Sequence, residues 1–313
     1  MNIVDHAGDL IPGTHRFSHA AMATTFEILI LHEDARYAHQ AAWEAFEELD
    51  RLEQELSRFI ENSDISRINN LAAGQPLRIG PDTFECLQLC ARMSTETEGA
   101  FDITIGSLLN CWLHEDKSTR TPSKKELDAA RRLTGMHLVQ LEEAGHTVQL
   151  EAGPVYIDLG GFGKGYAVDR MAELLRDWSI DTALIHGGAS SVLALGAPPG
   201  TEGWPLTLSR PPHHQQTLAQ ICLQDRALSG SGLQKGQHII DPRTAHPVEG
   251  RVAAWASAPT AATADALSTA FMVMAPEAVN SYCSDHPGAL AMIVLADQGM
   301  GAHEDNILRF GPW

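Results

Sequence analysis

The sequence predicts an α+β fold in which mixed or antiparallel sheets are flanked by helices. Short apolar or alternating runs, typical of strands, outnumber the segments with helical periodicity. Turn residues rather than helical crossovers separate most of these runs, which favours antiparallel pairing over a doubly wound parallel sheet. The 313 residues contain no internal repeat and no low-complexity linker, and their number suits about two domains or one large two-lobed domain.

The N-terminal part begins without a recognisable pattern. We expect residues 1–17 to form an arm and residues 18–313 to form a single domain. Residues 21–31, AMATTFEILIL, are rich in Thr, Phe and Ile and predict a strand. A long helix follows, because apolar side chains recur every three or four residues from residue 42 to residue 59 and acidic side chains occupy the other face.

The middle of the chain alternates between helices and short strands. Helices are predicted at residues 82–93 and 123–133, and the second begins with a capping box of Ser123 and Glu126. Three runs at 137–141, 146–151 and 155–159 predict a meander that leads through a glycine-rich turn into a helix. The later elements are a helix at 164–178, strands at 182–186, 191–195, 204–209, 218–224, 252–258, 290–295 and 306–310, and helices at 263–273 and 276–285.

The charge balance excludes one class of partner. The chain has 22 Lys and Arg against 40 Asp and Glu, which gives a formal net charge of −18. Nucleic-acid-binding proteins need a basic face to displace counterions from phosphates, and a surface this acidic repels a polyanion. We therefore expect no nucleic-acid partner.

Membrane and export signals are not visible in the sequence. The longest apolar stretches, such as residues 271–275, fall far short of the roughly 20 residues that span a bilayer. No basic segment with a following apolar run opens the chain, so no export signal is indicated. The five cysteines include no C-x-x-C pair and fit reduced thiols, so we expect a cytoplasmic protein without a membrane span.

The first segment that indicates chemistry is DLGGFGKG at residues 158–165. Four glycines lie between a predicted buried strand and a helix that begins with a lysine, and so bare a backbone can approach phosphates closely. The pattern is neither a Walker A loop nor the G-x-G-x-x-G fingerprint of dinucleotide-binding folds. A different nucleotide-binding loop and a plain strand-to-helix turn both remain open at this point.

The second segment places hard oxygen atoms on one face of a helix. Asp265, Ser268 and Thr269 follow one another at spacings of three and four residues. Mg²⁺ typically takes one or two carboxylates together with substrate phosphates, and a helix N-terminus adds partial positive charge for the same anion. The alternative is that Asp265 serves only as a first-turn acid.

The third segment contains a candidate acid or base. Residues 229–232, SGSG, predict a loop, and His238 precedes a short strand that ends at a proline turn. His238 can titrate near neutral pH, although a single histidine is more often structural. Two other segments are ambiguous: residues 186–189 as a strand-end turn and residues 101–104 as a half-buried strand.

Taken in order, eight segments form a specific set. They are MATTFEI at 22–28, LSRFIENSDISRIN at 56–69, AFDITIGSLLNCW at 100–112, IDLGGFGKGYAVDR at 157–170, ALIHGGASSVLALG at 183–196, ALSGSG at 227–232, HIIDPRTAHPV at 238–248 and ADALSTAFMV at 264–273. This set resembles the ApbE family, the FAD:protein FMN transferases, and it covers almost the whole chain from about residue 18. The resemblance implies an ApbE-like two-lobed domain.

The resemblance also implies an activity and its site residues. Members of the family use Mg²⁺ to transfer the FMN half of FAD onto a Ser or Thr hydroxyl of an acceptor flavoprotein, with release of AMP. The implied metal-binding positions are Gly161, Asp265, Ser268 and Thr269, and the implied flavin-binding positions are Met22, Phe59, Ala100, Phe101, Asp102, Asp158, Lys164 and Ile239. His238 and Asp265 fall at the implied catalytic positions.

These implications leave several alternatives. Mn²⁺ accepts the same hard oxygen ligands as Mg²⁺. Asp102 or Asp241 could replace His238 as the group that accepts the hydroxyl proton. The segment between Ser229 and His238 is shorter than in typical members, so hydrolysis of FAD to FMN and AMP without an acceptor, or FAD binding without catalysis, are the competing functions.

Overall fold

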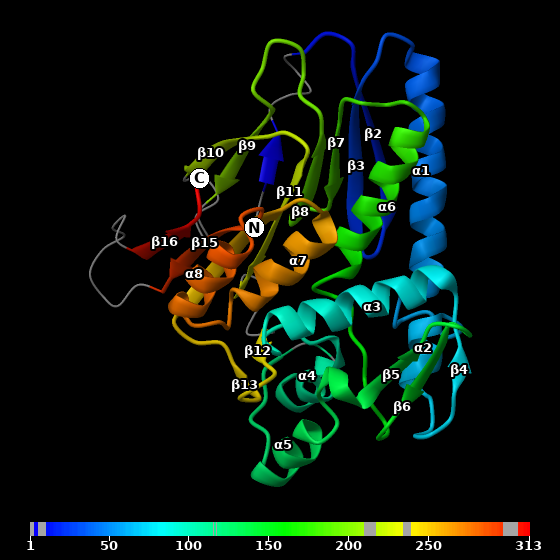
Figure 1. The fold of residues 1–313 in the computed structure, drawn as a ribbon, viewed down its shortest axis with the longest axis vertical. Helices are drawn as coiled ribbons and strands as arrows, with labels where there is room; N and C mark the ends of the chain where they lie inside the picture. Colours follow the sequence, from blue (N-terminus) through cyan, green and yellow to red (C-terminus); the bar gives the residue numbers. More distant parts are fainter. Residues whose placement is uncertain are drawn as a thin grey trace.

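The computed structural model describes residues 3–5, 11–114, 116, 118–209, 217–233, 239–296 and 306–313. Figure 1 shows an upper part built on a large sheet with α1, α6, α7 and α8, and a lower part that contains α2 to α5 and a small sheet. One continuous apolar core runs through both parts, since it includes Leu49 of α1, Leu87 of α3, Val148 of β6 and Leu267 of α7. The lower part is therefore packed onto the upper one.

The large sheet has eight strands in the order β16-β15-β14-β11-β8-β7-β3-β2, and every neighbouring pair is antiparallel. This arrangement confirms the predicted α+β class with antiparallel pairing. The strands are β2 (Thr14–Ala21), β3 (Thr24–Leu31), β7 (Ala183–Gly187), β8 (Ser191–Leu195), β11 (Arg226–Gly232), β14 (Arg251–Ala258), β15 (Leu290–Leu295) and β16 (Ile307–Phe310).

Three smaller sheets complete the strand structure of the described residues. One has the order β1-β9-β10, with β1 (Ile3–Asp5), β9 (Trp204–Ser209) and β10 (Thr217–Leu223). A second has the order β4-β6-β5, with β4 (Leu77–Arg78), β5 (Val139–Glu142) and β6 (Thr147–Leu150). The hairpin of β12 (Ile240–Asp241) and β13 (His246–Pro247) is the third.

Every predicted helix has a counterpart near its expected position, whereas the short helices α2 and α4 were not predicted. The helices are α1 (Ala35–Leu56), α2 (Asp64–Asn69), α3 (Pro81–Glu96), α4 (Gly106–Trp112), α5 (Lys124–Arg131), α6 (Gly163–Asp177), α7 (Ala261–Ala270) and α8 (Pro276–Asp285), with 3-10 turns at Ile103–Ile105 and Met136–Leu138. The predicted capping box of Ser123 and Glu126 is present at the start of α5. None of the helices in the described ranges is long and apolar enough to cross a bilayer.

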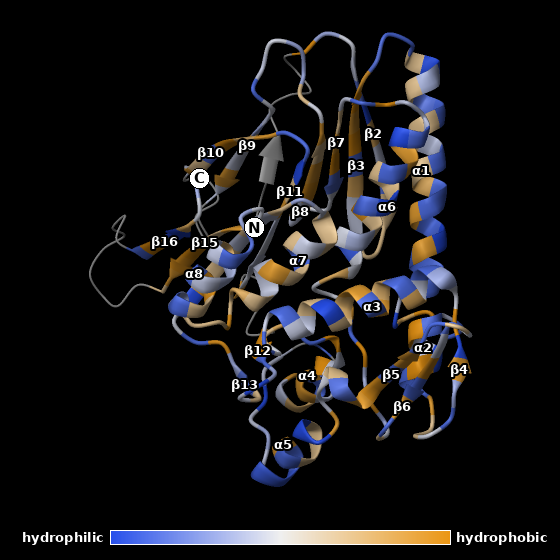
Figure 2. Ribbon diagram, in the orientation of Figure 1, coloured by the Kyte–Doolittle hydropathy of each residue, from blue (hydrophilic) through white to orange (hydrophobic). Residues whose placement is uncertain are grey.

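Both faces of the large sheet are buried, which explains why its central strands are continuously apolar. In β3, Ile28 and Ile30 pack into the core that the helices cover, whereas Leu29 packs into a second core on the opposite face. Trp204 of β9 and Trp255 of β14 fill that second core. Figure 2 shows the same pattern, with apolar strands at the centre and mixed hydropathy along α1.

The N-terminal prediction is wrong at its boundary. Residues 14–17, assigned to the arm, belong to β2, and the predicted strand at 21–31 is a hairpin of β2 and β3. The turn residues Met22 and Ala23 adopt φ values of 49° and 57°, a left-handed conformation that no glycine signals in the sequence. The Met22 N–H donates to the Glu53 carboxylate of α1 at 2.7 Å, which holds the turn.

Residues 155–159 are extended, but they form no strand of a sheet, contrary to the prediction. The Asn69 side chain accepts from the Ile157 N–H at 2.7 Å and donates to the Ile157 carbonyl at 3.0 Å. The Asp158 N–H donates to the Ile103 carbonyl, and the Tyr156 carbonyl accepts from Gly106. A side-chain amide and two loop contacts therefore replace the ladder of a neighbouring strand.

Three further predictions need correction. Residues 229–232 are not a loop but part of β11, and they pair with residues of β14. Residues 101–104 form no strand: Asp102 caps a 3-10 turn by accepting from the Thr104 N–H. Helix α1 ends at Leu56, so Phe59 lies beyond the helix and its side chain is 77% exposed.

Candidate active site

The glycine-rich turn at residues 158–165 leads directly into the first turn of α6. The Leu159 carbonyl accepts from the N–H groups of Phe162 and Gly163, which tightens the chain before the helix begins. The N-cap residue Phe162 offers no side-chain hydrogen bond to α6, and the first turn of the helix has no acidic residue of its own. The positive end of the helix dipole is therefore not neutralised from within this turn, as suits a site that attracts anions.

Lys164 and Asp265 meet at this turn. The Lys164 ammonium lies 3.1 Å from the Gly160 carbonyl and 3.4 Å from a carboxylate oxygen of Asp265. The same Asp265 oxygen accepts from the Gly165 N–H at 3.2 Å. Asp265 is only 3% exposed, and such a buried carboxylate needs compensating positive charge, which these donors supply.

The hydroxyl groups of α7 form a cluster with a serine of the large sheet. The Ser231 oxygen of β11 lies 2.9 Å from the Ser268 oxygen and 3.0 Å from the Thr269 oxygen. Both α7 hydroxyls also donate to the Asp265 carbonyl, at 2.9 Å for Ser268 and 3.3 Å for Thr269. Ser231 was not predicted as a site residue, because its SGSG segment was assigned to a loop.

The glycine turn and α7 lie in direct contact at Gly161. A Cβ atom placed on Gly161 would lie 2.8 Å from the Thr269 hydroxyl oxygen. The structure thus brings Gly161, Asp265, Ser268 and Thr269 together from two segments about a hundred residues apart. Gly161 and Thr269 are half-buried, whereas Ser268 is fully buried, so the cluster opens to solvent on the side of the turn.

The donor atoms of this cluster are hard oxygens with a single carboxylate. In the described part of the chain, no three His, Cys, Asp or Glu side chains gather in a way that could hold a metal ion. A cation here would depend on Asp265, the half-buried Thr269 hydroxyl and backbone oxygens of the turn. That set suits Mg²⁺, which keeps several water or phosphate ligands and needs only one or two carboxylates.

Asp158 connects the turn to an exposed aromatic ring. One carboxylate oxygen accepts from the Gly160 N–H at 2.7 Å, and the other lies 3.0 Å from Nε of Arg58. The Arg58 guanidinium in turn lies 4.1 Å from the ring centroid of Phe59. Sequence reasoning singled out Asp158 and Phe59 but missed Arg58, which joins them.

The segment with Ala100, Phe101 and Asp102 lies behind the turn and is buried. The Phe101 ring packs against the Phe162 ring with centroids 6.0 Å apart. Asp102 accepts from the N–H and the hydroxyl of Thr104 and from the Met136 N–H. Burial raises the pKa of Asp102, and these hydrogen bonds oppose the shift, so its oxygens are engaged in local structure.

Met22 lies at the same end of the large sheet as Lys164. A Cβ on Gly187 would lie 3.5 Å from the Lys164 carbonyl, and one on Gly188 would lie 2.5 Å from the Thr24 hydroxyl. The hairpin turn that carries Met22 directly precedes Thr24. The end of β7 therefore contacts both the first turn of α6, at Lys164, and the residue that follows the turn of β2 and β3.

Asp241 belongs to β12 and Ile239 immediately precedes that strand. The hairpin of β12 and β13 lies below α7 in Figure 1. The Ile239 side chain is buried, and its carbonyl accepts from the Val248 N–H at 2.9 Å. Arg243 donates to both carboxylate oxygens of Asp241 at 2.9 Å, so this alternative base is held in a bidentate ion pair. His238 lies outside the described residues.

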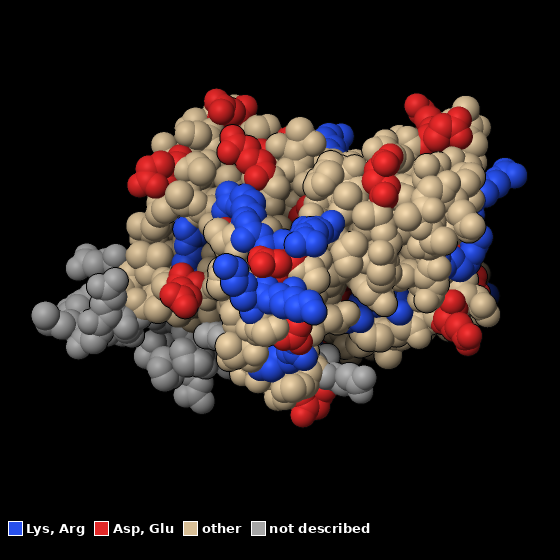
Figure 3. Space-filling view, turned by 90° about the horizontal axis from the view of Figure 1, so that it is seen from below, with Lys and Arg blue, Asp and Glu red and all other residues tan. Residues whose placement is uncertain are grey.

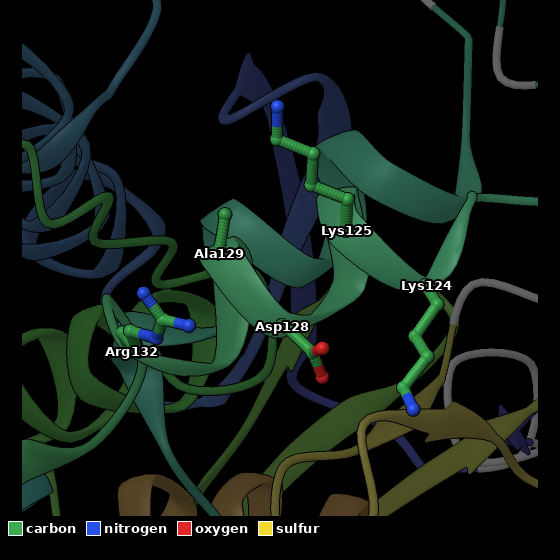
Figure 4. Close-up of a pocket in the computed structure, with 5 residues that line it drawn as sticks. All are labelled: Lys124, Lys125, Asp128, Ala129 and Arg132. Atoms are coloured by element: carbon green, nitrogen blue, oxygen red, sulfur yellow. The ribbon is translucent and has the colours of Figure 1, made fainter.

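Two hollows on the surface lie outside this cluster. One, of about 370 Å³, borders the extended segment before the turn and is lined in part by Asn69, Gly153 and Tyr156. The other, of about 460 Å³, lies on α5. Figure 4 shows its lining side chains, Lys124, Lys125, Asp128, Ala129 and Arg132, spread over the outer side of the helix.

Basic side chains gather on the lower face of the molecule. Figure 3 shows Lys and Arg grouped at the middle of this face, although the chain as a whole has a net charge of −18. The charged residues that line the α5 hollow belong to this lower part of the fold. None of the residues that line the α5 hollow is a predicted site residue. The hollow is therefore separate from the candidate site at the glycine turn.

Asp169 of α6 is a further carboxyl that sequence reasoning missed. Its two oxygens accept from the N–H groups of Ala261 and Ala262 at 2.7 Å and 2.8 Å. Burial raises its pKa from 3.8 to about 7, while the hydrogen bonds from Ala262 and Ala261 oppose the shift. The proton on this carboxyl is therefore held more tightly in the folded chain than in the unfolded chain.

This raised pKa predicts how pH affects stability. The Asp169 carboxyl contributes stability that is fully present below its unfolded pKa and is lost as pH rises through about 7. Asp169→Asn removes this ionisation. The unfolding free energy of the unaltered chain relative to the variant is therefore expected to fall between about pH 4 and pH 7, as measured by urea unfolding. Parallel pH profiles for the two proteins would contradict this expectation.

Comparisons with known proteins agree with the predicted resemblance. A sequence model described as the ApbE family matches residues 22–294. A protein of Vibrio cholerae named FAD:protein FMN transferase is 29% identical over 273 residues, which cover 80% of this chain and 80% of that protein. A protein of Escherichia coli strain K12 with the same name is 28% identical over 274 residues, covering 82% of this chain and 77% of that protein.

Solved structures share the fold. The ApbE protein of Thermotoga maritima superposes with a TM-score of 0.82 at 27% identity, and the match covers 95% of this chain and 97% of that chain. The apo flavinyl transferase ApbE of Pseudomonas stutzeri gives a TM-score of 0.80 at 25% identity over 91% and 92% of the two chains. The predicted ApbE-like architecture is therefore confirmed.

Proposed function

Since the chain belongs to the ApbE family, we propose that it transfers the FMN moiety of FAD onto a Ser or Thr hydroxyl of an acceptor flavoprotein, with release of AMP and in dependence on Mg²⁺. The observation that carries the proposal is the contact of the glycine turn with the oxygen cluster of α7 at Gly161 and Thr269. Relatives named FAD:protein FMN transferase match about four fifths of the chain, and their name supports FAD as substrate and a protein as acceptor.

Three groups of this chain would hold the metal. The Asp265 carboxylate brings the only charge, the half-buried Thr269 hydroxyl faces the turn, and the Gly161 carbonyl belongs to the turn itself. The fully buried Ser268, which donates to the Asp265 carbonyl, fits a supporting contact better than an outward ligand. When bound, Mg²⁺ or Mn²⁺ would neutralise charge on the FAD pyrophosphate.

The remaining site residues would bind and orient FAD. The Lys164 ammonium and the first turn of α6, which has no acidic residue of its own, both present positive charge where a pyrophosphate would lie. Phe59 offers an exposed ring for stacking, and Arg58 fixes it next to Asp158. Met22, Phe101 and Ile239 would supply apolar contacts from three other segments around the turn.

The transfer also needs a group that accepts the hydroxyl proton of the acceptor. Asp102 is engaged by Thr104 and Met136, and Asp241 is engaged by Arg243. Both carboxylates are thus engaged in contacts that hold neighbouring segments in place. His238 therefore stays the proposed general base, next in the chain to the buried Ile239.

A cytoplasmic location is part of the proposal. The chain has five cysteines, and all five are free thiols. Cys86 and Cys90 lie one turn apart in α3, buried and without a disulfide, although both belong to the same helix face. Reduced thiols fit a reducing compartment.

The test separates transfer from its two alternatives. The protein is incubated with FAD and Mg²⁺, with and without a flavoprotein that carries a candidate Ser or Thr site. Transfer predicts AMP release together with flavin fluorescence on the denatured acceptor, and no labelling when that Ser or Thr is replaced by Ala. Free FMN and AMP without acceptor labelling would establish hydrolysis instead, and FAD binding without AMP release would contradict any catalytic role.

A further inference from the structure

Helices α6 and α7 each contribute a carboxylate that accepts hydrogen bonds from N–H groups at the start of the other helix. Asp265 of α7 accepts from the Gly165 N–H in the first turn of α6. Asp169 of α6 accepts from the Ala261 and Ala262 N–H groups in the first turn of α7. Each helix therefore uses an acid from inside its own sequence, about one turn from its start in α7 and nearly two turns from its start in α6, to satisfy N–H groups of the other helix.

The exchange depends on a very close approach of the two backbones. A Cβ atom on Gly165 would lie 2.3 Å from the Ala261 carbonyl oxygen and 2.9 Å from the Ala262 Cα. No side chain fits between the two helices at this point, so glycine is required at residue 165 for steric reasons. The start of α7 therefore lies directly against the start of α6.

Asp169 is a largely buried cap that makes two hydrogen bonds to the backbone of α7. Its carboxyl binds two successive N–H groups with separate oxygens, at 2.7 Å and 2.8 Å. Arg176 and Glu173 act on Asp169 as charges of opposite sign, and the contacts that bind its two oxygens directly are the N–H groups of Ala261 and Ala262. Its partners are therefore the N–H groups of α7, and its position depends on the position of that helix.

The first turn of α7 in turn determines where the oxygen cluster lies. Asp265 follows Ala261 by one helical turn, and Ser268 and Thr269 follow Asp265 by one more. Any rotation or shift at Ala261 would move all three oxygen-bearing side chains relative to Gly161. Thr269 and Gly161 are already in contact, so a small shift would change the spacing of the proposed metal ligands.

We propose that Asp169 is a positioning residue for the divalent cation site, acting through the backbone of α7 and touching neither metal nor FAD. This inference rests on the proposed function, because it assumes a cation between the glycine turn and α7. A purely structural cap would lower stability when it is removed and would leave cation affinity unchanged. A positioning residue would lower cation affinity in a protein that still folds.

The experiment compares Asp169→Asn and Asp169→Ala in the full chain. Asn keeps one acceptor oxygen for the two N–H groups, whereas Ala keeps none. Binding of Mn²⁺ alone is followed by electron paramagnetic resonance, and the Mg²⁺ concentration that gives half-maximal AMP release from FAD is measured in parallel. We expect the Mn²⁺ dissociation constant to rise by about tenfold for Asn and by more for Ala, since residues behind metal ligands typically contribute this much.

Asp64→Asn is the control for the loss of a buried carboxylate that accepts from an N–H group, and it also loses the ion pair of Asp64 with Arg67. Asp64 is likewise buried and accepts from the Gly80 N–H at the start of α3 at 2.7 Å, in the lower part of the fold. This variant should lose stability in urea unfolding and keep the Mn²⁺ affinity of the unaltered chain. Comparison of the two variants distinguishes the general effect of losing a buried carboxylate cap from a specific effect of Asp169 on Mn²⁺ affinity.

The possible outcomes each decide the proposal. A tenfold weaker Mn²⁺ site in Asp169→Asn with a native near-ultraviolet circular dichroism spectrum supports it. Equal Mn²⁺ affinity in the unaltered chain and Asp169→Asn overturns it and leaves the proposed function intact. Failure of the unaltered chain to bind Mn²⁺, alone or with FAD, overturns the proposed metal dependence and this inference with it.

Discussion

Asp265→Ala is expected to lower Mg²⁺-dependent AMP release from FAD by roughly a thousandfold or more, because it removes the only charged ligand of the proposed cation site. The change also removes the acceptor of the Gly165 N–H and the carboxylate beside Lys164. AMP is quantified by chromatography over a range of Mg²⁺ concentrations. Release at the unaltered rate would contradict the assigned metal role.

Two companion variants locate the cause of this effect. Asp265→Asn keeps an oxygen for the Gly165 N–H but loses the charge, so it should fold normally and still lose most of the activity. Asp34→Ala removes a different carboxyl, which caps α1 through the Arg36 and Tyr37 N–H groups. This change should lower stability only slightly, because it removes a solvent-exposed cap, and it should leave AMP release unchanged.

Gly165→Ala is expected to destabilise the fold by about 3 kcal/mol, the upper end of the usual cost of overpacking. Alanine normally stabilises a helix relative to glycine by up to about 1 kcal/mol, but here its Cβ would meet the backbone of α7. A shift of α6 away from α7 that makes room for this Cβ is also expected to move Gly161 away from Thr269. Urea unfolding measures the loss, and Mn²⁺ affinity should fall in the same variant.

Gly163→Ala is the control for this prediction. It lies in the same helix, and its Cβ would make only an ordinary contact with the Leu159 Cβ at 3.6 Å. The unfolding free energy of this variant should stay within about 1 kcal/mol of that of the unaltered chain. If both glycine variants were equally stable, the close approach of α6 and α7 would not be a constraint on the fold.

Much of the fold could be predicted from local patterns. Helix α6 and strand β15 have clear periodicity or continuous apolar runs, and the structure places them within about one residue of the prediction. The hairpin of β2 and β3 was missed because its turn residues, Met22 and Ala23, include no glycine to signal a left-handed conformation. The segment around Ile157 was assigned to a strand because its side chains alternate between apolar and polar. These apolar side chains are buried, but the segment pairs with no neighbouring strand.

The site was predictable only where a single segment carries the chemistry. The glycine turn and the α7 oxygens are visible as local motifs, but their contact at Gly161 and Thr269 arises from packing across the sequence. Ser231 was missed because the two glycines of its segment resemble a loop, whereas they lie in a central strand. Arg58 and Asp169 act through partners far away in the sequence, and no local pattern indicates such partners.

Anomalous diffraction from crystals grown with FAD and Mn²⁺ tests the central claim most directly. The account predicts one Mn²⁺ peak at about 2 Å from the Asp265 carboxylate, the Thr269 hydroxyl and the Gly161 carbonyl, with the FAD pyrophosphate on its open side. A peak at any other place in the fold, or a pyrophosphate bound without a cation beside Gly161, would contradict it.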